Sequence, residues 1–98
     1  MDNNTRYVAE WIEAQHVDEF GEWNPDRDEY AGRNCPSLAL AKAVAIRESK
    51  RCGVVEWCRV TEEVFNPDLG IPRRSDAAWD VVCTYHGDWS GNWSEDRS

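Results

Sequence analysis

The stretch CPSLALAKAVAIRESKRCGVVEWCRV, residues 35–60, predicts a helix followed by a strand and decides the fold. Ser37 can cap the helix, because its hydroxyl can accept a hydrogen bond from the free N–H groups of the first turn. Basic residues in the last turn and Gly53 directly after it mark the helix end. The signals predict a helix over Leu38–Cys52 and a strand over Val54–Thr61.

One face of this helix suits packing on a sheet. At about 100° per residue, small and apolar side chains gather in one arc of about 120°, interrupted near its middle by Glu48. We expect this arc to lie on the sheet and the basic residues to lie outside it. The arc consists of Leu38, Ala41, Val44, Ala45 and Cys52.

The chain before the helix predicts a hairpin and a loop. Residues 6–17, RYVAEWIEAQHV, are rich in aromatic and β-branched residues and favour a strand, although the alanines and glutamates make a helix the competing interpretation. A turn with Gly21 at the position of positive φ then leads into a short edge strand through Trp23. Residues 27–34 are interpreted as a polar loop.

After the predicted strand 54–61, the prolines and glycine of residues 66–74 indicate a long connection, and Ala77–His86 predicts the last strand. The fold expected is α+β: an antiparallel sheet in the order β-β-α-β-β with one helix packed on one face. A β-α-β-β version, with residues 6–23 as one long bent strand, is the alternative. Residues 1–98 form a single domain, and the tail from residue 87 is either flexible or folded back over the sheet.

Composition excludes several classes of protein. Hydrophobic residues make up 41% of the chain, which argues against disorder. The formal net charge is −8, with 19 acidic and 11 basic residues, so direct binding to nucleic acid is not expected. The N-terminus has no signal-like pattern, and no apolar run approaches the length of a membrane span. We expect a cytoplasmic protein without membrane contact.

The cysteines and histidines do not form a recognisable site. In a reducing compartment Cys35, Cys52, Cys58 and Cys83 are expected to be free thiols, with two disulfides or a structural zinc site as alternatives. A dyad of Cys83 and His86 is disfavoured, because these positions point to opposite faces of a strand. No phosphate loop or hydrolase motif is present. The sequence predicts neither an enzyme nor a cofactor.

Acidic residues concentrate between positions 10 and 29, where a single base, Arg27, stands against them. Carboxylates on one face of a strand repeat about every 6.6–6.8 Å, close to two phosphate steps of a DNA strand, so such a surface can imitate DNA. The alternatives are an acidic hairpin that only aids solubility, or one that faces the basic helix. The acidic candidates for partner binding are Glu10, Glu13, Asp18, Glu19, Glu22, Asp26, Asp28 and Glu29.

The chain has six tryptophans, more than a small core needs. Those in predicted strands are expected to pack in the sheet. Trp23 at the turn, and Trp89 and Trp93 in the tail, are candidate anchors at a protein interface. If the tail folds back on the sheet, its tryptophans pack there instead.

The acidic stretch AEWIEAQHVDEFGEWNPDRDEY and the tryptophan-rich end TYHGDWSGNWSEDRS resemble, in overall character, the small acidic anti-CRISPR proteins that phages direct at type I effector complexes. The resemblance implies a non-enzymatic inhibitor in the bacterial cytoplasm that binds a basic nucleic-acid-binding surface of a Cas subunit and blocks DNA. We expect it to act as a monomer. The alternative is a small protein–protein interaction module with an unrelated partner.

Overall fold

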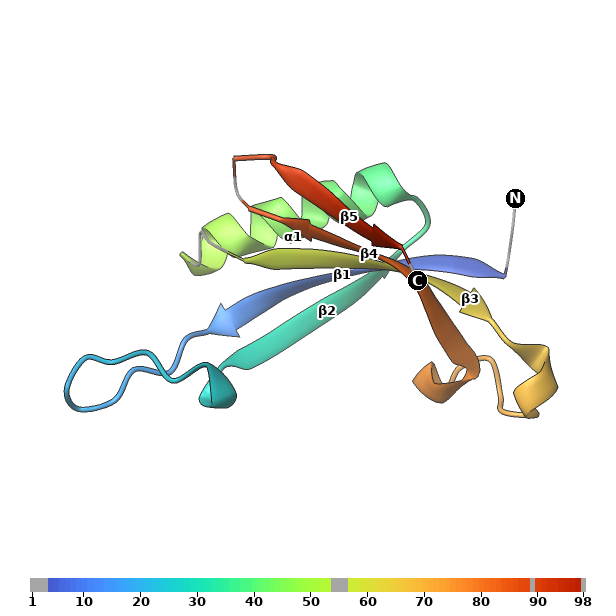
Figure 1. Cartoon of the computed structure of the whole chain (residues 1–98), viewed down its shortest axis with the longest axis horizontal. Coiled ribbons are helices and arrows are strands. Elements are labelled where there is room, and N and C mark those ends of the chain that lie inside the picture. The colour runs from blue at the N-terminus through green and yellow to red at the C-terminus, as the bar shows by residue number, and fades with distance from the viewer. Residues whose placement is uncertain (1–3, 54–56, 89, 98) are drawn as a thin grey trace.

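A computed structural model describes residues 4–53, 57–88 and 90–97. Five strands form one antiparallel sheet in the order β2-β1-β3-β4-β5, and one helix covers part of one face (Figure 1). The α+β fold with an antiparallel sheet is therefore confirmed. The elements are β1 (Thr5–Ala14), β2 (Glu29–Cys35), α1 (Leu38–Cys52), β3 (Cys58–Phe65), β4 (Trp79–Gly87) and β5 (Trp93–Arg97), with 3-10 turns at Pro25–Arg27, Pro67–Leu69 and Asp76–Ala78.

Helix α1 begins and ends at the predicted residues. The Ser37 hydroxyl accepts a hydrogen bond from the Leu40 N–H at 3.2 Å, which satisfies one of the free donors of the first turn. Gly53 adopts the left-handed conformation, with φ of 76°, and its N–H donates to the carbonyl of Lys50. A residue with a Cβ would be strained there, so glycine fixes the helix end.

The core lies between α1 and the strands beneath it. Ala41, Val44 and Ala45 are buried, as the predicted arc requires, and they belong to one cluster with Ala9 and Val60 of the central strands. The small alanine side chains allow the helix backbone to approach the sheet closely. Among the described residues, no α-helix covers the outer face of the sheet, on the side away from α1 (Figure 1).

Glu48, the charged residue inside the predicted arc, is buried. It forms an ion pair with Arg51 at 2.6 Å and a longer one with Arg47 at 3.5 Å. The neighbouring guanidinium of Arg51 lowers the pKa of the Glu48 carboxyl. The charge is therefore retained because it is paired.

The segment before the helix differs from the prediction. Residues 29–35, predicted as loop, form strand β2, and the predicted strand through Trp23 is reduced to an isolated bridge between Val17 and Trp23. The alternative with one long bent strand over residues 6–23 is also wrong, because β1 ends at Ala14. The sequence of β2 does not predict a strand, because its residues are polar and show no apolar alternation. Backbone pairing with β1 makes it a strand at the edge of the sheet.

The strands after the helix agree better with the sequence predictions than the segment before the helix does. Strand β3 runs on to Phe65, beyond the predicted end, while the first predicted residues, 54–56, lie outside the described residues. Strand β4 lies within two residues of its prediction. Residues 93–97 form β5, which pairs with β4 and extends the sheet at its other edge.

Candidate protein-binding surface

Residues 15–28, here called the arm, connect β1 to β2 and extend beyond the end of the sheet (Figure 1). The arm is held by backbone contacts of its own. The bridge between Val17 and Trp23 joins its two sides, and the Asn24 N–H donates to the His16 carbonyl at 2.8 Å. These contacts make the arm a defined hairpin.

The tip of the arm is organised by Asp18. One oxygen of its carboxylate accepts hydrogen bonds from the backbone N–H groups of Phe20 and Glu22, each at 2.9 Å. Gly21 has the predicted positive φ, at 81°, and donates to the Asp18 carbonyl at 3.0 Å. Asp18 is thus a positioning residue that fixes the turn, because Asp side chains close turns in this way.

The base of the arm is organised by a second carboxylate. Asp28 accepts from the indole N–H of Trp23, with its two oxygens at 2.9 and 2.8 Å, and from the His16 backbone N–H at 2.9 Å. Trp23 is 48% exposed and is fixed in orientation by this contact. Both Asp18 and Asp28 therefore shape the arm.

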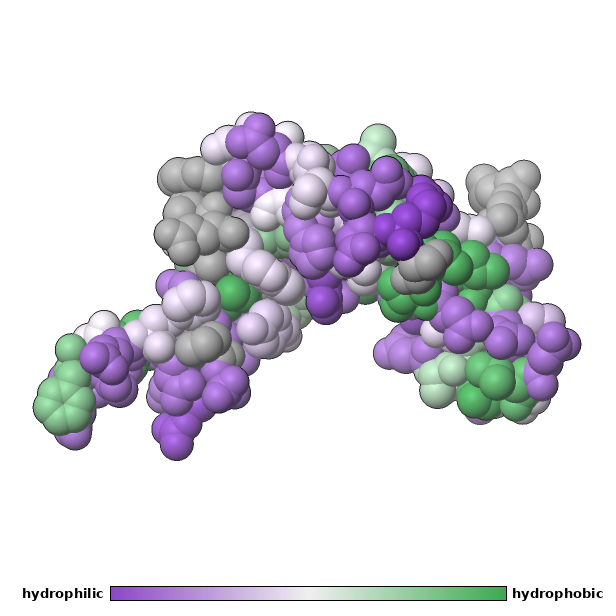
Figure 2. All heavy atoms as spheres, viewed as in Figure 1, coloured by the Kyte–Doolittle hydropathy of each residue, from purple (hydrophilic) through white to green (hydrophobic). Residues whose placement is uncertain are grey.

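The tip carries an exposed aromatic side chain among free carboxylates. Phe20 is 83% exposed, the most exposed of the large hydrophobic residues in the described chain, and Val17 also lies open on the arm. Figure 2 shows apolar surface at the tip of the arm beside hydrophilic surface. Glu19, Glu22 and Asp26 have side chains with no hydrogen-bond or ion-pair partner among the described residues. Sequence reasoning missed Phe20, although an aromatic residue beside a turn glycine in an acidic stretch could have indicated it.

The structure separates two predicted site residues from the arm. Glu10 pairs with Arg59 at 2.6 Å, and Glu13 pairs with Arg51 of α1 at 2.8 Å. The Arg51 guanidinium, together with a hydrogen bond from the Trp11 indole at 2.6 Å, lowers the pKa of Glu13. Glu13 therefore links β1 to the basic helix, as the alternative of an acidic segment facing that helix requires, whereas Glu10 pairs with Arg59 of β3 within the sheet.

The remaining predicted residues lie elsewhere. Glu29 is exposed in edge strand β2. Trp93 is partly buried: it packs against the core cluster, and Lys42 lies 5.3 Å from its ring centroid. Trp89 lies outside the described residues. The structure thus brings together Asp18, Glu19, Glu22, Trp23, Asp26 and Asp28 on the arm, and not the others.

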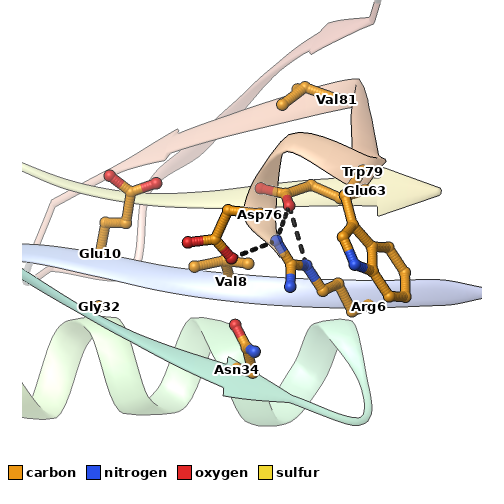
Figure 3. A pocket seen from close by; sticks show the side chains of 9 residues that line it. All are labelled: Arg6, Val8, Glu10, Gly32, Asn34, Glu63, Asp76, Trp79 and Val81. Carbon is orange, nitrogen blue, oxygen red and sulfur yellow. Dashed lines mark hydrogen bonds and ion pairs between the residues drawn. The ribbon is translucent and has the colours of Figure 1, made fainter. Parts of the chain in front are cut away.

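A shallow pocket of about 550 Å³ opens on the outer face of the sheet (Figure 3). Arg6 dominates it, with hydrogen bonds to Glu63 at 2.7 and 2.9 Å and to Asp76 at 3.0 Å. The guanidinium also stacks over the Trp79 ring at 4.5 Å. Arg6 is therefore already paired with two carboxylates, and the charged residues of the pocket wall are net acidic, with Glu10, Glu63 and Asp76 against Arg6. The remaining lining residues are Val8, Glu10, Gly32, Asn34 and Val81.

The thiols do not form a reactive centre. All four cysteines are free, and Cys35, Cys58 and Cys83 are buried. Burial raises the pKa of Cys58 to about 11, which keeps it protonated and inert. Cys83 is buried, while His86 is exposed on the other face of β4. Among the described residues, no group of three or more His, Cys, Asp or Glu side chains could hold a metal ion.

Comparison with family models, with curated proteins and with solved structures finds no match to this chain. In the described part of the chain, no helix has the length and apolar character needed to cross a membrane. The arm is the candidate site on geometry alone.

Proposed function

We propose that this protein is a non-enzymatic inhibitor that inserts its arm into a basic, nucleic-acid-binding surface of a host-defence complex. The observation that carries the proposal is the tip of the arm: an exposed Phe20 in a fixed turn, flanked by the unpaired carboxylates of Glu19 and Glu22. A type I CRISPR–Cas effector is the complex we propose, from the resemblance to anti-CRISPR proteins. Occupying its DNA-binding groove would exclude target DNA.

The arm has the two features of a binding hot spot. Burying an exposed phenylalanine contributes about 1.5–3 kcal/mol, so Phe20 can supply a substantial share of a protein contact. The hydrogen bonds that the Asp18 and Asp28 carboxylates accept order the arm before binding. Less conformational entropy is then lost when the complex forms.

The charge of the arm selects the partner. Residues 15–28 contain five carboxylates and one arginine, and this excess attracts a surface rich in Lys and Arg. Such attraction increases the association rate and weakens as salt screens it. A groove that binds the DNA backbone offers this kind of surface. The arm and DNA would then compete for the same Lys and Arg side chains of the groove.

The test uses charge reversal on the arm and a matched reversal elsewhere. Glu19→Lys with Glu22→Lys should weaken binding to the effector complex and abolish DNA displacement, because the arm would then repel the basic groove. Asp68→Lys with Asp96→Lys makes the same change in net charge at exposed positions outside the arm, whose side chains have no described partners. This control should keep full activity. Equal loss in both double variants would contradict a role for the arm.

A second candidate, an interaction module whose partner does not bind nucleic acid, is favoured by the exposure of Phe20 and Val17. Binding would then depend on apolar contact and would change little with salt. In that case Phe20→Ala should abolish binding while the double charge reversal leaves most of it. If Phe20→Ala and the Glu19→Lys, Glu22→Lys double variant both lose binding, and binding depends strongly on salt, the result would support the inhibitor that competes with DNA.

A further inference from the structure

Strand β2 forms one edge of the sheet, and its outer side is not paired with another strand of the described chain. It pairs with β1 on one side, and its residues, EYAGRNC, include neither the Lys nor the Pro that commonly blocks an edge strand. Its outer backbone groups are available to another strand. The opposite edge, β5, ends in the charged run Glu95–Arg97, which makes β2 the better edge for pairing.

In place of the monomer expected from the sequence, we propose that β2 pairs antiparallel with β2 of a second copy of this chain, about a two-fold axis at Ala31. In this register Glu29 of each copy lies opposite Arg33 of the other, so the interface contains two cross-strand pairs of opposite charge. Tyr30 lies opposite Gly32 in the same way. Residues directly opposite each other share a face, so the two sheets become continuous with both α1 helices on one side.

Neighbouring registers lack this complementarity. Moving the axis to Tyr30 leaves Arg33 with no strand residue opposite it, because Arg27 lies in the 3-10 turn before β2, and moving the axis to Gly32 places Glu29 opposite Cys35. An axis at either charged residue would place that residue opposite its own copy. Like charges directly opposite each other destabilise a strand pair. The axis at Ala31 is therefore the register that the sequence of β2 specifies.

The charged side chains that the register joins have no ion-pair partner within the described part of the single chain. Glu29 and Arg33 are exposed, and neither has a hydrogen-bond or ion-pair partner for its side chain among the described residues. Tyr30 is 53% exposed, with its ring 5.4 Å from that of Trp57 in an edge-on contact. Pairing would give each of these groups a neighbour without breaking a described ion pair.

The Tyr30–Gly32 pair has a precedent within this sheet. Gly87 of β4 lies opposite Trp93 of β5, and the indole ring covers the glycine so closely that a Cβ there would lie 2.6 Å from it. An aromatic side chain can thus stabilise a glycine in the facing strand. Gly32 also lines the pocket on the outer face, beside the edge that the second copy would cover. Tyr30 of the second copy would close that side of the pocket.

Sedimentation velocity over a concentration series tests the proposal. A single pair of short strands makes a small contact, and each chain carries a net charge of −8, so we expect a dimer of micromolar affinity. Arg33→Glu or Glu29→Arg alone should weaken dimerisation by at least about tenfold, because each places like charges opposite one another twice. The double variant Glu29→Arg with Arg33→Glu should restore it.

Asp96→Arg, on the other edge strand, is the control and should leave the dimer unchanged. Circular dichroism of each variant separates a lost interface from a lost fold. A wild-type chain that stays monomeric throughout the series overturns the proposal. So does a dimer that the single reversals do not weaken, or one that the double variant fails to restore. The variants lie outside the arm, so this result is independent of the proposed inhibitor function.

Discussion

Gly87→Ala tests whether Trp93 is packed into the sheet or is a free anchor. Gly87 has an ordinary backbone conformation, so alanine is not strained by the backbone itself. The added Cβ would nevertheless lie 2.6 to 2.7 Å from three carbons of the Trp93 ring. Carbon atoms in contact prefer about 3.5–4.0 Å, so the ring must retreat by about 1 Å.

That displacement should be costly, because Trp93 packs against the core cluster and lies under Lys42. Overpacking of this kind costs about 1–3 kcal/mol. In a domain of this size each kcal/mol lowers the melting temperature by about 4–8 °C. Urea unfolding followed by circular dichroism measures the loss. A change below about 0.5 kcal/mol would show that the ring does not cover Gly87.

A double-mutant cycle assigns the cost to the ring. With Trp93→Ala in place, the added methyl group at position 87 finds no ring to displace, and alanine in a strand is slightly favourable relative to glycine. Gly87→Ala should then be neutral or stabilising. The expected coupling between the two changes is about 1–3 kcal/mol. Equal destabilisation by Gly87→Ala in both backgrounds would refute the packing described for β5.

Three further predictions concern the core, the thiols and the pH dependence. Ala45→Leu should destabilise by about 1–3 kcal/mol in urea unfolding, since Ala45 is fully buried on the face of α1 that packs on the sheet; Ala43→Leu, on the exposed side of α1, should change little. A thiol reagent should modify at most Cys52 rapidly in the native protein and all four cysteines in denaturant, so rapid native reaction of Cys58 would contradict its burial. The pKa of Glu13 is held below the ordinary value of 4.5, so its contribution to the free energy of unfolding is fully present above that pH and is lost as the pH falls below it. Glu13→Gln should be less stable at neutral pH and should lose less stability on acidification to about pH 3.

The sequence predicted the elements that have strong local signals. Helix α1 has a capping serine, a periodic small face and a terminal glycine, and each of these acts within a few residues. Strand β2 has no such signal. It is polar and exposed because it lies at the edge, and only its pairing with β1 makes it a strand. A polar edge strand such as β2 is therefore not detected by a search for alternating apolar residues.

The sequence indicated where the candidate site lies, but not which of its acidic residues are paired, free or part of the turn structure. Charge density indicated the acidic segment around the first turn, yet it could not distinguish Glu13, which is paired with the distant Arg51, from Glu19, which is free. Likewise, Asp18 and Asp28 appear in sequence as two more acidic residues, whereas the structure uses them to fix the arm. Such roles depend on contacts between residues far apart in the chain or on turn geometry.

The most direct test of the proposed function is DNA displacement from purified type I effector complexes, measured at several salt concentrations. The account predicts that the wild-type protein displaces double-stranded DNA and that its binding weakens steeply with salt. Phe20→Ala and the Glu19→Lys, Glu22→Lys double variant should both be unable to displace the DNA. Absence of binding to every effector complex, or displacement that persists in the double variant, would contradict it.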